Sequence, residues 1–561
     1  MKDKIELYFN TVKYLKWKQI VTRILRKIKP TKENSEKKGY IKNMLHLYVE
    51  ILDADMTYLK RFQVEELMQN KVHLLHETHT INLKDWKLNT ATTHLWLFNL
   101  QYMEYLIPLA VEYNKTKNYR YYEKIKEIIS SWKNCFYEVK GDAWEAYVIS
   151  LRLPNWLIVM QLIEEELNKD EEFLELLTDS MCRQYEHLKV HTEEHLLGNH
   201  YLENLKTLFI CSVLFGEVEE ENRYRKLLLD EYKEQILSDG MHFELSFMYH
   251  KIVAEGLLRV ILVMKQKGKQ TQDVYEQFVQ IFQRMCDVTA SFECGNSRTL
   301  LFNDAGDNVS KSAEAIIKAG MHTGLLPSVN KNKNALSDAG YYQYLCGETK
   351  FVVDCGKIGP DYMPGHGHCD CLSYELFYKG KPLVVNSGTF QYQDVKRSYF
   401  RSTKAHNTFM INEVEQSQCW GEHRVAKRIK NIKATQTSDK FIGECTFWNG
   451  KKAKRTIEFD DNSIKIIDEE VSNNQDEIIS IIHFAPEFSL TEICDKNYEV
   501  KYLNEKCVAY IEILSGNGTR VDKNQNKYFY AHDFGQCTEI EVLEVTSDRA
   551  SCVQYKIEWR E

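Results

Sequence analysis

Long apolar runs, a cleavable leader and metal-type cysteine pairs are all absent from this 561-residue sequence. No stretch reaches the roughly 18 apolar residues that a transmembrane helix needs, so no transmembrane segment is predicted. Near the N-terminus lysines interrupt every apolar run, and no small-residue cleavage site follows, which argues against a signal peptide. We therefore expect a cytoplasmic protein.

Paired thiols and excess positive charge are also missing. The 15 cysteines are an odd number without any C-x-x-C pair, and Cys369-x-Cys371 alone is a weak indication of zinc. Buried, reduced thiols are the expectation, which favours a reducing compartment. The formal net charge of −8 does not favour a nucleic-acid partner, and an anionic substrate would need a local basic patch.

The length of the chain calls for two or three domains. Within residues 1–40, Trp17–Ile28 has apolar residues at helical spacing, and a polar linker follows over 31–40. Such a basic amphipathic helix could make peripheral contact with a membrane. Docking on its own domain is the more ordinary arrangement for the same pattern.

The remaining chain has two regions that differ in the periodicity of their apolar residues. Helical periodicity dominates 41–325, in successive pairs, which predicts a helical array or α/α toroid. Alternating segments separated by turns such as Lys379-Gly380 predict an antiparallel β-sandwich over 335–561. The predicted fold is multidomain α+β, with the toroid first and the sandwich second.

Two loops that open helices carry the polar residues of the helical half. In GNHYLEN (198–204), His200 and Glu203 share a helical face, while Asn199 is either a site residue or a helix cap. In DGMHFELSFMYH (239–250), one helix hairpin later, Tyr249 lies near a helix start and either faces a groove or packs half-buried. Glu244 and His250 of the same motif have the same two interpretations. Both loops should lie on one rim.

The stretch beginning PGHGHCD at Pro364 is the strongest candidate for a site. His366 and His368 stand two residues apart, and His406 precedes a later strand. With Asn386, which ends the segment PLVVN, they offer two imidazoles and an oxygen, a plausible zinc-type set. The alternative is a group of histidines satisfied by backbone groups.

These motifs resemble the heparinase II/III-like polysaccharide lyases and their relatives among alginate lyases. The resemblance rests on GNHYLEN, DGMHFELSFMYHKIVAEGLL, FNDAGD (302–307), PGHGHCDCLSYELFYKGKPLVVNSG and FRSTKAHNT, and it covers most of the chain. It implies an α/α toroid followed by a β-sandwich. It also implies cleavage of an acidic, uronate-containing polysaccharide by β-elimination, with a base at C5, an acid at the leaving oxygen and groups that neutralise the uronate carboxylate.

The resemblance also implies roles for particular residues. Asn199 and His200 would hold the carboxylate, with His200 as the base in some relatives, and Glu203 matches a catalytic-site glutamate. Tyr249 would be the acid, and in some members the base as well. His366 would help neutralise the carboxylate.

On the β side, Tyr392 matches a tyrosine that serves as base, with Tyr399 as a rival. Because an ordinary phenol ionises near pH ~10, a nearby cation would have to lower its pKa. Arg397 and Arg401 are the candidates, and with Glu244 and His250 they are the expected substrate-binding residues.

A structural divalent metal, most often zinc, is a further implication. Its ligands would be His368, Asn386 and His406. Asn386 stands where the family has Asp, which removes a charge and should weaken the site. No organic cofactor is expected.

Other functions remain open. A uronate 5-epimerase of the same fold would share the proton abstraction, and a non-catalytic glycan-binding protein could share the scaffold. A glycoside hydrolase is disfavoured because no persuasive carboxylate pair is present. Without an export signal, a role in making or turning over a surface polysaccharide fits better than scavenging.

Overall fold

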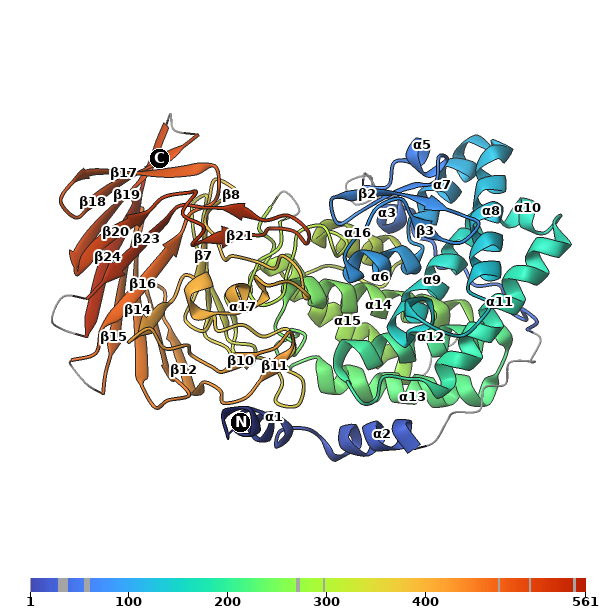
Figure 1. The fold of residues 1–561 in the computed structure, drawn as a ribbon, viewed down its shortest axis with the longest axis horizontal. Helices are drawn as coiled ribbons and strands as arrows, with labels where there is room; N and C mark the ends of the chain where they lie inside the picture. The colour runs from blue at the N-terminus through green and yellow to red at the C-terminus, as the bar shows by residue number, and fades with distance from the viewer. Residues whose placement is uncertain are drawn as a thin grey trace.

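The computed structural model describes residues 2–28, 39–54, 61–268, 273–295, 298–472, 475–503, 506–547 and 551–560. The first half of the chain is mainly helical and the second is rich in strands, and the two lie at opposite ends of an elongated body (Figure 1). The linker predicted over 31–40 lies, through residue 38, outside the described residues.

Helices of the first half surround one apolar core that includes the fully buried Trp96, Trp132 and Trp156. The apolar run over 93–114 forms two helices, because Met103 takes a left-handed conformation (φ 55°) and ends the first. The helices are α3 (Glu50–Asp53), α5 (Val64–Leu67), α6 (His94–Tyr102), α7 (Leu106–Thr116), α8 (Tyr119–Cys135), η1 (Asp142–Trp144), α9 (Ala146–Leu162), α10 (Glu164–Leu167), α11 (Glu171–Val190), α12 (Gly198–Phe215), α13 (Val218–Gln235), α14 (Phe247–Gln266), α15 (Asp273–Ser291) and α16 (Ala313–His322).

A small antiparallel sheet interrupts the helical half. It comprises β1 (Lys71–Leu74), β2 (Glu77–Asn82) and β3 (Lys87–Leu88). Its strands were not predicted, because they are short and lie within a region dominated by helical periodicity, although β1 shows alternate burial at Val72 and Leu74.

Within the described part of the second half, three larger antiparallel sheets contribute to one core. Residues 341–354 form a hairpin that turns at Gly347 (φ 55°). In sheet order, the strands are β4 (Ala335–Leu336), β5 (Tyr341–Cys346), β6 (Thr349–Asp354), β7 (Tyr374–Tyr378) and β8 (Lys381–Val384); then β20 (Asn517–Val521), β23 (Val542–Thr546), β16 (Ile478–His483) and β9 (Phe409–Ile411); then β12 (Lys430–Gln436), β13 (Lys440–Thr446), β14 (Lys452–Asp460), β15 (Ser463–Glu470), β24 (Cys552–Trp559), β19 (Lys506–Ser515), β18 (Asn497–Tyr502) and β17 (Phe488–Cys494).

Short elements lie beside these sheets. The strand pairs are β10 (Cys419–Trp420) with β11 (Arg424–Val425), and β21 (Phe529–Tyr530) with β22 (Thr538–Glu539). The helical turns are α17 (Arg397–Phe400) and η2 (Thr403–Ala405).

Two N-terminal helices run along one side of the molecule and contact both halves (Figure 1). They are α1 (Lys2–Val12) and α2 (Trp17–Ile28), and the second has the predicted bounds. The buried side chain of Gln19 donates to the carbonyl oxygens of Leu196 (3.0 Å) in the helical half and Tyr362 (3.3 Å) in the strand-rich half. The predicted docking of this helix on its own protein is therefore observed. Among the described helices, none has the length and apolar character needed to cross a membrane.

Candidate active site

A cavity of about 460 Å³ lies between the two halves. The helical half contributes His200, Glu203 and Tyr249 to its wall, and the strand-rich half contributes His366 and Tyr392. Five residues predicted from separate motifs thus meet around one space large enough for a sugar unit.

The two helix-opening loops meet as predicted. The backbone N–H and the Nδ2 of Asn199 donate to the two carboxylate oxygens of Glu244, at 2.9 and 2.6 Å. Leu197, with φ 66°, occupies the cap position of α12, so Asn199 lies in the first turn and is not the cap. At the other helix, Ser246 caps α14 and accepts from the N–H of Tyr249, which orients the tyrosine.

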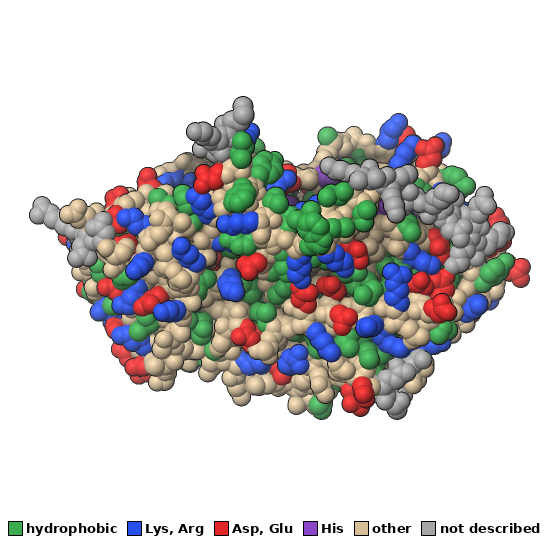
Figure 2. All heavy atoms as spheres, turned by 90° about the horizontal axis from the view of Figure 1, so that it is seen from below, with side chains coloured by type: hydrophobic (Ala, Val, Ile, Leu, Met, Phe, Trp, Pro, Cys, Tyr) green, Lys and Arg blue, Asp and Glu red, His purple; other side chains and the backbone are tan. Residues whose placement is uncertain are grey.

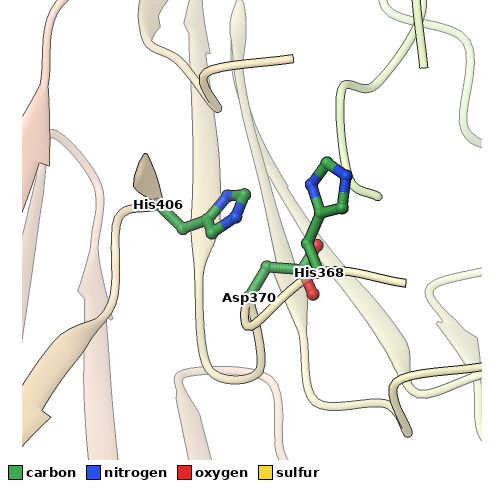
Figure 3. A group of neighbouring side chains, drawn as sticks. All are labelled: His368, Asp370 and His406. Atoms are coloured by element: carbon green, nitrogen blue, oxygen red, sulfur yellow. The ribbon is translucent and has the colours of Figure 1, made fainter. Parts of the chain in front are cut away.

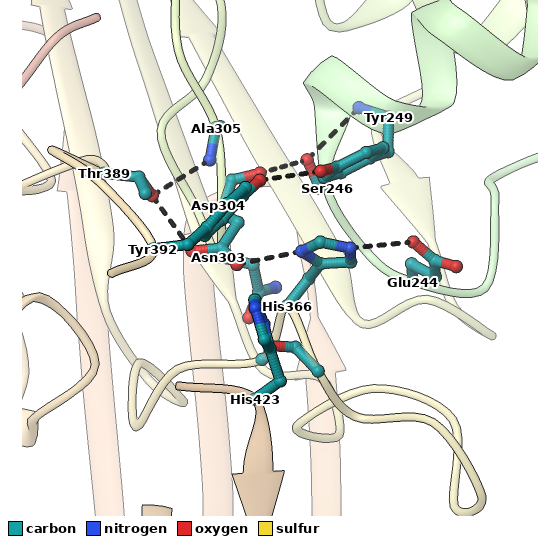
Figure 4. A network of polar contacts seen from close by, with 12 residues as sticks. Glu244, Ser246, Tyr249, Asn303, Asp304, Ala305, His366, Thr389, Tyr392 and His423 are labelled. Atoms are coloured by element: carbon teal, nitrogen blue, oxygen red, sulfur yellow. Dashed lines mark hydrogen bonds and ion pairs between the residues drawn. The ribbon is translucent and has the colours of Figure 1, made fainter. Parts of the chain in front are cut away.

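Tyr249 and Tyr392 form a hydroxyl pair across the boundary between the halves, with the two oxygens 2.6 Å apart (Figure 4). Burial raises the pKa of both phenols well above the ordinary value. Tyr392 raises the pKa of Tyr249 further, whereas the hydrogen bond with Tyr249 lowers the pKa of Tyr392 without overcoming burial. The positive charge of Arg397, whose Cζ lies 5.2 Å from the Tyr392 ring centre, lowers the pKa of Tyr392 without overcoming burial and the charge of Asp304. Both tyrosines are therefore protonated in the empty cavity at neutral pH.

His366 lies directly against this pair, its ring centre 4.1 Å from that of Tyr249. Its Nδ1 donates to Asp304 Oδ2 (2.9 Å), so its Nε2 faces Asn199 Nδ2 (3.4 Å) and Glu244 Oε2 (3.7 Å). The imidazole is held from both sides, as a preorganised site requires.

Asp304 is the centre of the network in Figure 4. Its fully buried carboxylate also accepts from His368 Nε2 (2.9 Å), Thr389 Oγ1 (3.1 Å) and both terminal nitrogens of Arg397. Burial opposes its charge, but Arg397 and the two histidines hold the pKa of Asp304 well below the usual range. One carboxylate thus fixes both histidines of the H-x-H motif.

His200 faces the cavity from the first turn of α12, with 35% of its side chain exposed. Its Nδ1 donates to Glu193 Oε1 (3.0 Å), and its ring lies 4.5 Å from that of Tyr147. Desolvation favours the neutral ring, but the Glu193 carboxylate raises the pKa of His200 above its ordinary value. Glu203 pairs with Lys206 at the same wall. His200 is thus suited to neutralising a carboxylate.

Several expected substrate-binding residues are not on the cavity wall. Glu244 is buried beneath it and orients Asn199, which also does not line the space. His250 faces the helix core, where its Nε2 contacts Met285 O (3.0 Å) and Thr289 Oγ1 (3.1 Å).

The two arginines expected to bind substrate also lie outside the cavity wall. Arg397 is neutralised by Asp304, and Arg401 donates to backbone carbonyls such as those of Gly367 and Glu422. They brace the loop that carries the histidines, and the pKa of Tyr392 stays above its ordinary value despite the charge of Arg397. Tyr399, the rival base, is buried against Phe529 and lies outside the cavity wall.

Sequence reasoning missed Asp304, Glu193 and His423. FNDAGD was noticed, but nothing in it indicates which aspartate would be buried. His423 lines the cavity 5.2 Å from the Tyr392 ring, and its position after a two-residue strand has no distinctive pattern. Glu193 is found only through its contact with His200.

His368, Asp370 and His406 form a second, fully buried cluster behind the cavity (Figure 3). Each offers a ligand atom within 4.8 Å of the others. His368 Nδ1 and His406 Nε2 have no hydrogen-bond partner, although their other ring nitrogens are held by Asp304 and Asn386. Asn386 was expected as a metal ligand, but its side-chain oxygen accepts a hydrogen bond from His406. The carboxylate of Asp370 is instead the oxygen ligand that lies within reach of both rings.

Comparisons with known proteins agree with this architecture. The Heparinase II/III N-terminus model matches residues 9–323, and the Heparinase II/III-like, C-terminal model matches 328–555. A heparin-sulfate lyase of Pedobacter heparinus is 26% identical over 266 residues, covering 43% of this chain and 40% of that protein. A heparin-sulfate lyase of Bacteroides thetaiotaomicron is 20% identical over 359 residues, covering 55% and 51%. The chain thus spans about half the length, or less, of these curated relatives.

Among solved structures, the crystal structure of heparinase III superposes with a TM-score of 0.68 at 16% identity. The superposition covers 95% of this chain and 88% of that one, which establishes the likeness of fold. A helical N-terminal part is followed by a sheet-rich C-terminal part in both. With family models matching nearly its whole length, the chain belongs to the heparinase II/III-like family.

Proposed function

We propose that this chain is a polysaccharide lyase that cleaves a uronate-containing glycan by β-elimination. The observation that carries the proposal is the Tyr249–Tyr392 hydroxyl pair, 2.6 Å apart in a cavity whose wall includes His200 and His366. The likeness to two heparin-sulfate lyases supports a glycosaminoglycan as substrate.

The two tyrosines provide a closed proton circuit. The phenolate of Tyr392 takes the C5 proton, the C5–H electrons form the C4–C5 double bond, and the C4–O4 bond breaks. The leaving oxygen takes the proton of Tyr249. A proton then passes from Tyr392 to Tyr249 along their direct hydrogen bond and restores the singly ionised pair, which forms from the neutral resting pair by loss of one proton to solvent.

The histidines make the C5 proton removable. Taking it adds negative charge next to a carboxylate, so the site needs cationic or donating groups at that carboxylate. His200, with its raised pKa, and the firmly held His366 serve this purpose. Asn199 and Glu244 act behind them by fixing His366, since neither lines the cavity.

The spacing of the tyrosines favours elimination over epimerisation. A 5-epimerase must return the proton to the opposite face of the sugar, and two hydroxyls in direct contact cannot stand on both sides of a ring. An adjacent acid and base instead suit a syn elimination, in which C5–H and C4–O4 lie on one face. Glucuronate has this arrangement and iduronate does not, so we propose glucuronate-containing chains as substrates.

A divalent metal, with zinc as the best match, is proposed for the cluster behind the cavity. His368 and His406 would supply nitrogen ligands and Asp370 an oxygen, while Asn386 would orient His406. The two partnerless, buried ring nitrogens support this assignment. When bound, the metal would brace the loop that presents His366.

We also infer that the helical half is an α/α toroid and the strand-rich half a β-sandwich. Consecutive helices such as α12 and α13, or α14 and α15, pack against each other in support of the first. The shared core beneath the eight-stranded and four-stranded sheets supports the second.

The proposal is tested by offering the purified chain heparan sulfate, hyaluronan, chondroitin sulfates and dermatan sulfate, and following the ultraviolet absorbance of an unsaturated uronate. Absorbance should rise on glucuronate-rich chains and be weak on iduronate-rich dermatan. Solvent deuterium entering C5 without any rise would indicate the epimerase. Binding without rise or exchange would indicate a glycan-binding protein.

A further inference from the structure

The N-terminal arm, defined as residues 2–28, exposes many large hydrophobic side chains. Seven of the nineteen exposed large hydrophobic residues in the described chain lie in it, including Trp17 (76% exposed), Phe9 (70%) and Ile5 (63%). Figure 2 faces this side and shows hydrophobic side chains gathered near its middle, with Lys and Arg among them. Large exposed apolar patches commonly mark interaction sites.

The arm is not a loose segment, because two of its polar side chains are buried against the rest of the protein. Gln19 is 1% exposed and bridges Leu196 and Tyr362, while Asn10 is 8% exposed. At the start of the arm, Trp420 Nε1 donates to Thr11 Oγ1 (3.0 Å). A helix that faces water normally buries its apolar residues, whereas this arm leaves its largest ones exposed and only half-buries others such as Ile20 and Val21.

The outward apolar residues follow helical spacing on both helices. Ile5, Phe9 and Val12 lie on one face of α1, and Trp17, Ile24 and Leu25 on one face of α2. The tight inner contacts therefore hold both apolar faces outward together.

The positive charge of the arm favours an anionic partner. Residues 1–28 contain eight Lys and Arg against two acidic residues, in a protein whose net charge is −8. The basic surface continues at the turn between the helices, where a cavity of about 360 Å³ is lined by Tyr14, Lys357, Arg428 and Lys430 together with Asp361. Arg428 stacks on Tyr14 at 3.8 Å. A second copy of this face would be repelled by like charge.

We propose that the outer face of the arm binds an anionic lipid surface, lying in the plane of the headgroups. Apolar side chains next to clustered lysine and arginine are the combination that interfacial helices use. Because the arm touches the loops before α12 and before His366, binding would hold the cavity close to the membrane. This proposal does not depend on the lyase activity.

The test is co-sedimentation of the full chain with vesicles of phosphatidylcholine, with or without phosphatidylglycerol. We expect binding only to the anionic vesicles, weakening as salt is raised. The double variant Phe9→Ser/Trp17→Ser should bind at least about tenfold more weakly, because two anchoring side chains are lost. Lys4→Glu/Lys13→Glu should bind more weakly and lose the salt dependence.

The matched control is Leu345→Ser/Leu503→Ser, which removes two leucines that are 58% and 57% exposed and lie in the strand-rich half. It should bind like the parent chain. Equal binding to pure phosphatidylcholine, no binding to either vesicle, or equal losses in control and arm variants would overturn the proposal. So would an arm variant that changes only self-association in sedimentation velocity, which would assign the face to a second copy of the chain.

Discussion

Replacing Asp304 by Asn removes one negative charge from the centre of the active-site network. Arg397 then keeps its positive charge in a buried position, with Glu422 O (3.0 Å) as its main remaining acceptor. The amide oxygen can accept from only part of the set formed by His366, His368 and Thr389.

Breaking a buried ion pair on one side costs about 3–5 kcal/mol. Against a typical free energy of unfolding of about 5–15 kcal/mol, this is a large share. We expect the urea midpoint of Asp304→Asn to fall accordingly. Turnover should fall by a further ~10–100-fold as His366 loses its orienting partner.

Asp307→Asn is the matched control, since it lies in the same FNDAGD motif. Its partners Arg298 and His532 are 31% and 32% exposed and can be hydrated, and an asparagine oxygen can still accept from Thr299 N–H, so the loss should be about 1 kcal/mol. The low pKa of Asp304 also determines how stability depends on pH. The ion pair of Asp304 with Arg397 stabilises the fold fully above the ordinary aspartate pKa, and this stabilisation is lost as the pH falls towards the pKa of Asp304 in the folded protein. The stability of Asp304→Asn should lack this acid dependence. A midpoint within about 1 kcal/mol of the parent, or equal to that of the control, would refute the assignment.

Three further predictions follow from local geometry. Because one of the two cavity tyrosines must ionise and burial raises both pKa values, kcat/KM should climb about tenfold per pH unit through the alkaline range; a plateau just above neutral pH would point to His200 as base. Gly367→Ala should lower stability by about 1–3 kcal/mol, because the new Cβ overlaps the Ile358 carbonyl, whereas Gly365→Ala meets only ordinary contact at 3.5 Å and should be nearly neutral in thermal melts. His406→Ala should reduce the zinc retained per chain in elemental analysis and lower the melting temperature; unchanged zinc content, or a parent chain that holds no metal, would contradict the proposed site.

Periodicity predicted the succession of helices and strands well because most of them have one buried face. It failed where backbone conformation decides, as at Met103, where a left-handed residue splits one apolar run into two helices. It also failed at the sheet formed by β1–β3, whose strands of two to six residues lie within a region dominated by helical periodicity.

For the site, motif position identified most of the cavity wall but not the direction of each side chain. His200 and Tyr249 face the cavity because they lie in first helical turns that open towards it, whereas His250, one residue after Tyr249, turns into the core. The partners that orient the site, above all Asp304, become visible only when distant loops are brought together. Their position in the sequence gives no indication of burial.

The most direct test of the proposed elimination compares the parent chain with Tyr249→Phe on a glucuronate-rich glycosaminoglycan. The substitution removes one hydroxyl and one hydrogen bond, so the melting temperature should change little, with a cost of about 1 kcal/mol. The parent should produce the ultraviolet absorbance of an unsaturated uronate, and the variant should lose at least ~10²–10⁴-fold in turnover. A variant that retains the parent rate, or a parent that produces no unsaturated product while folded and substrate-bound, would contradict the mechanism.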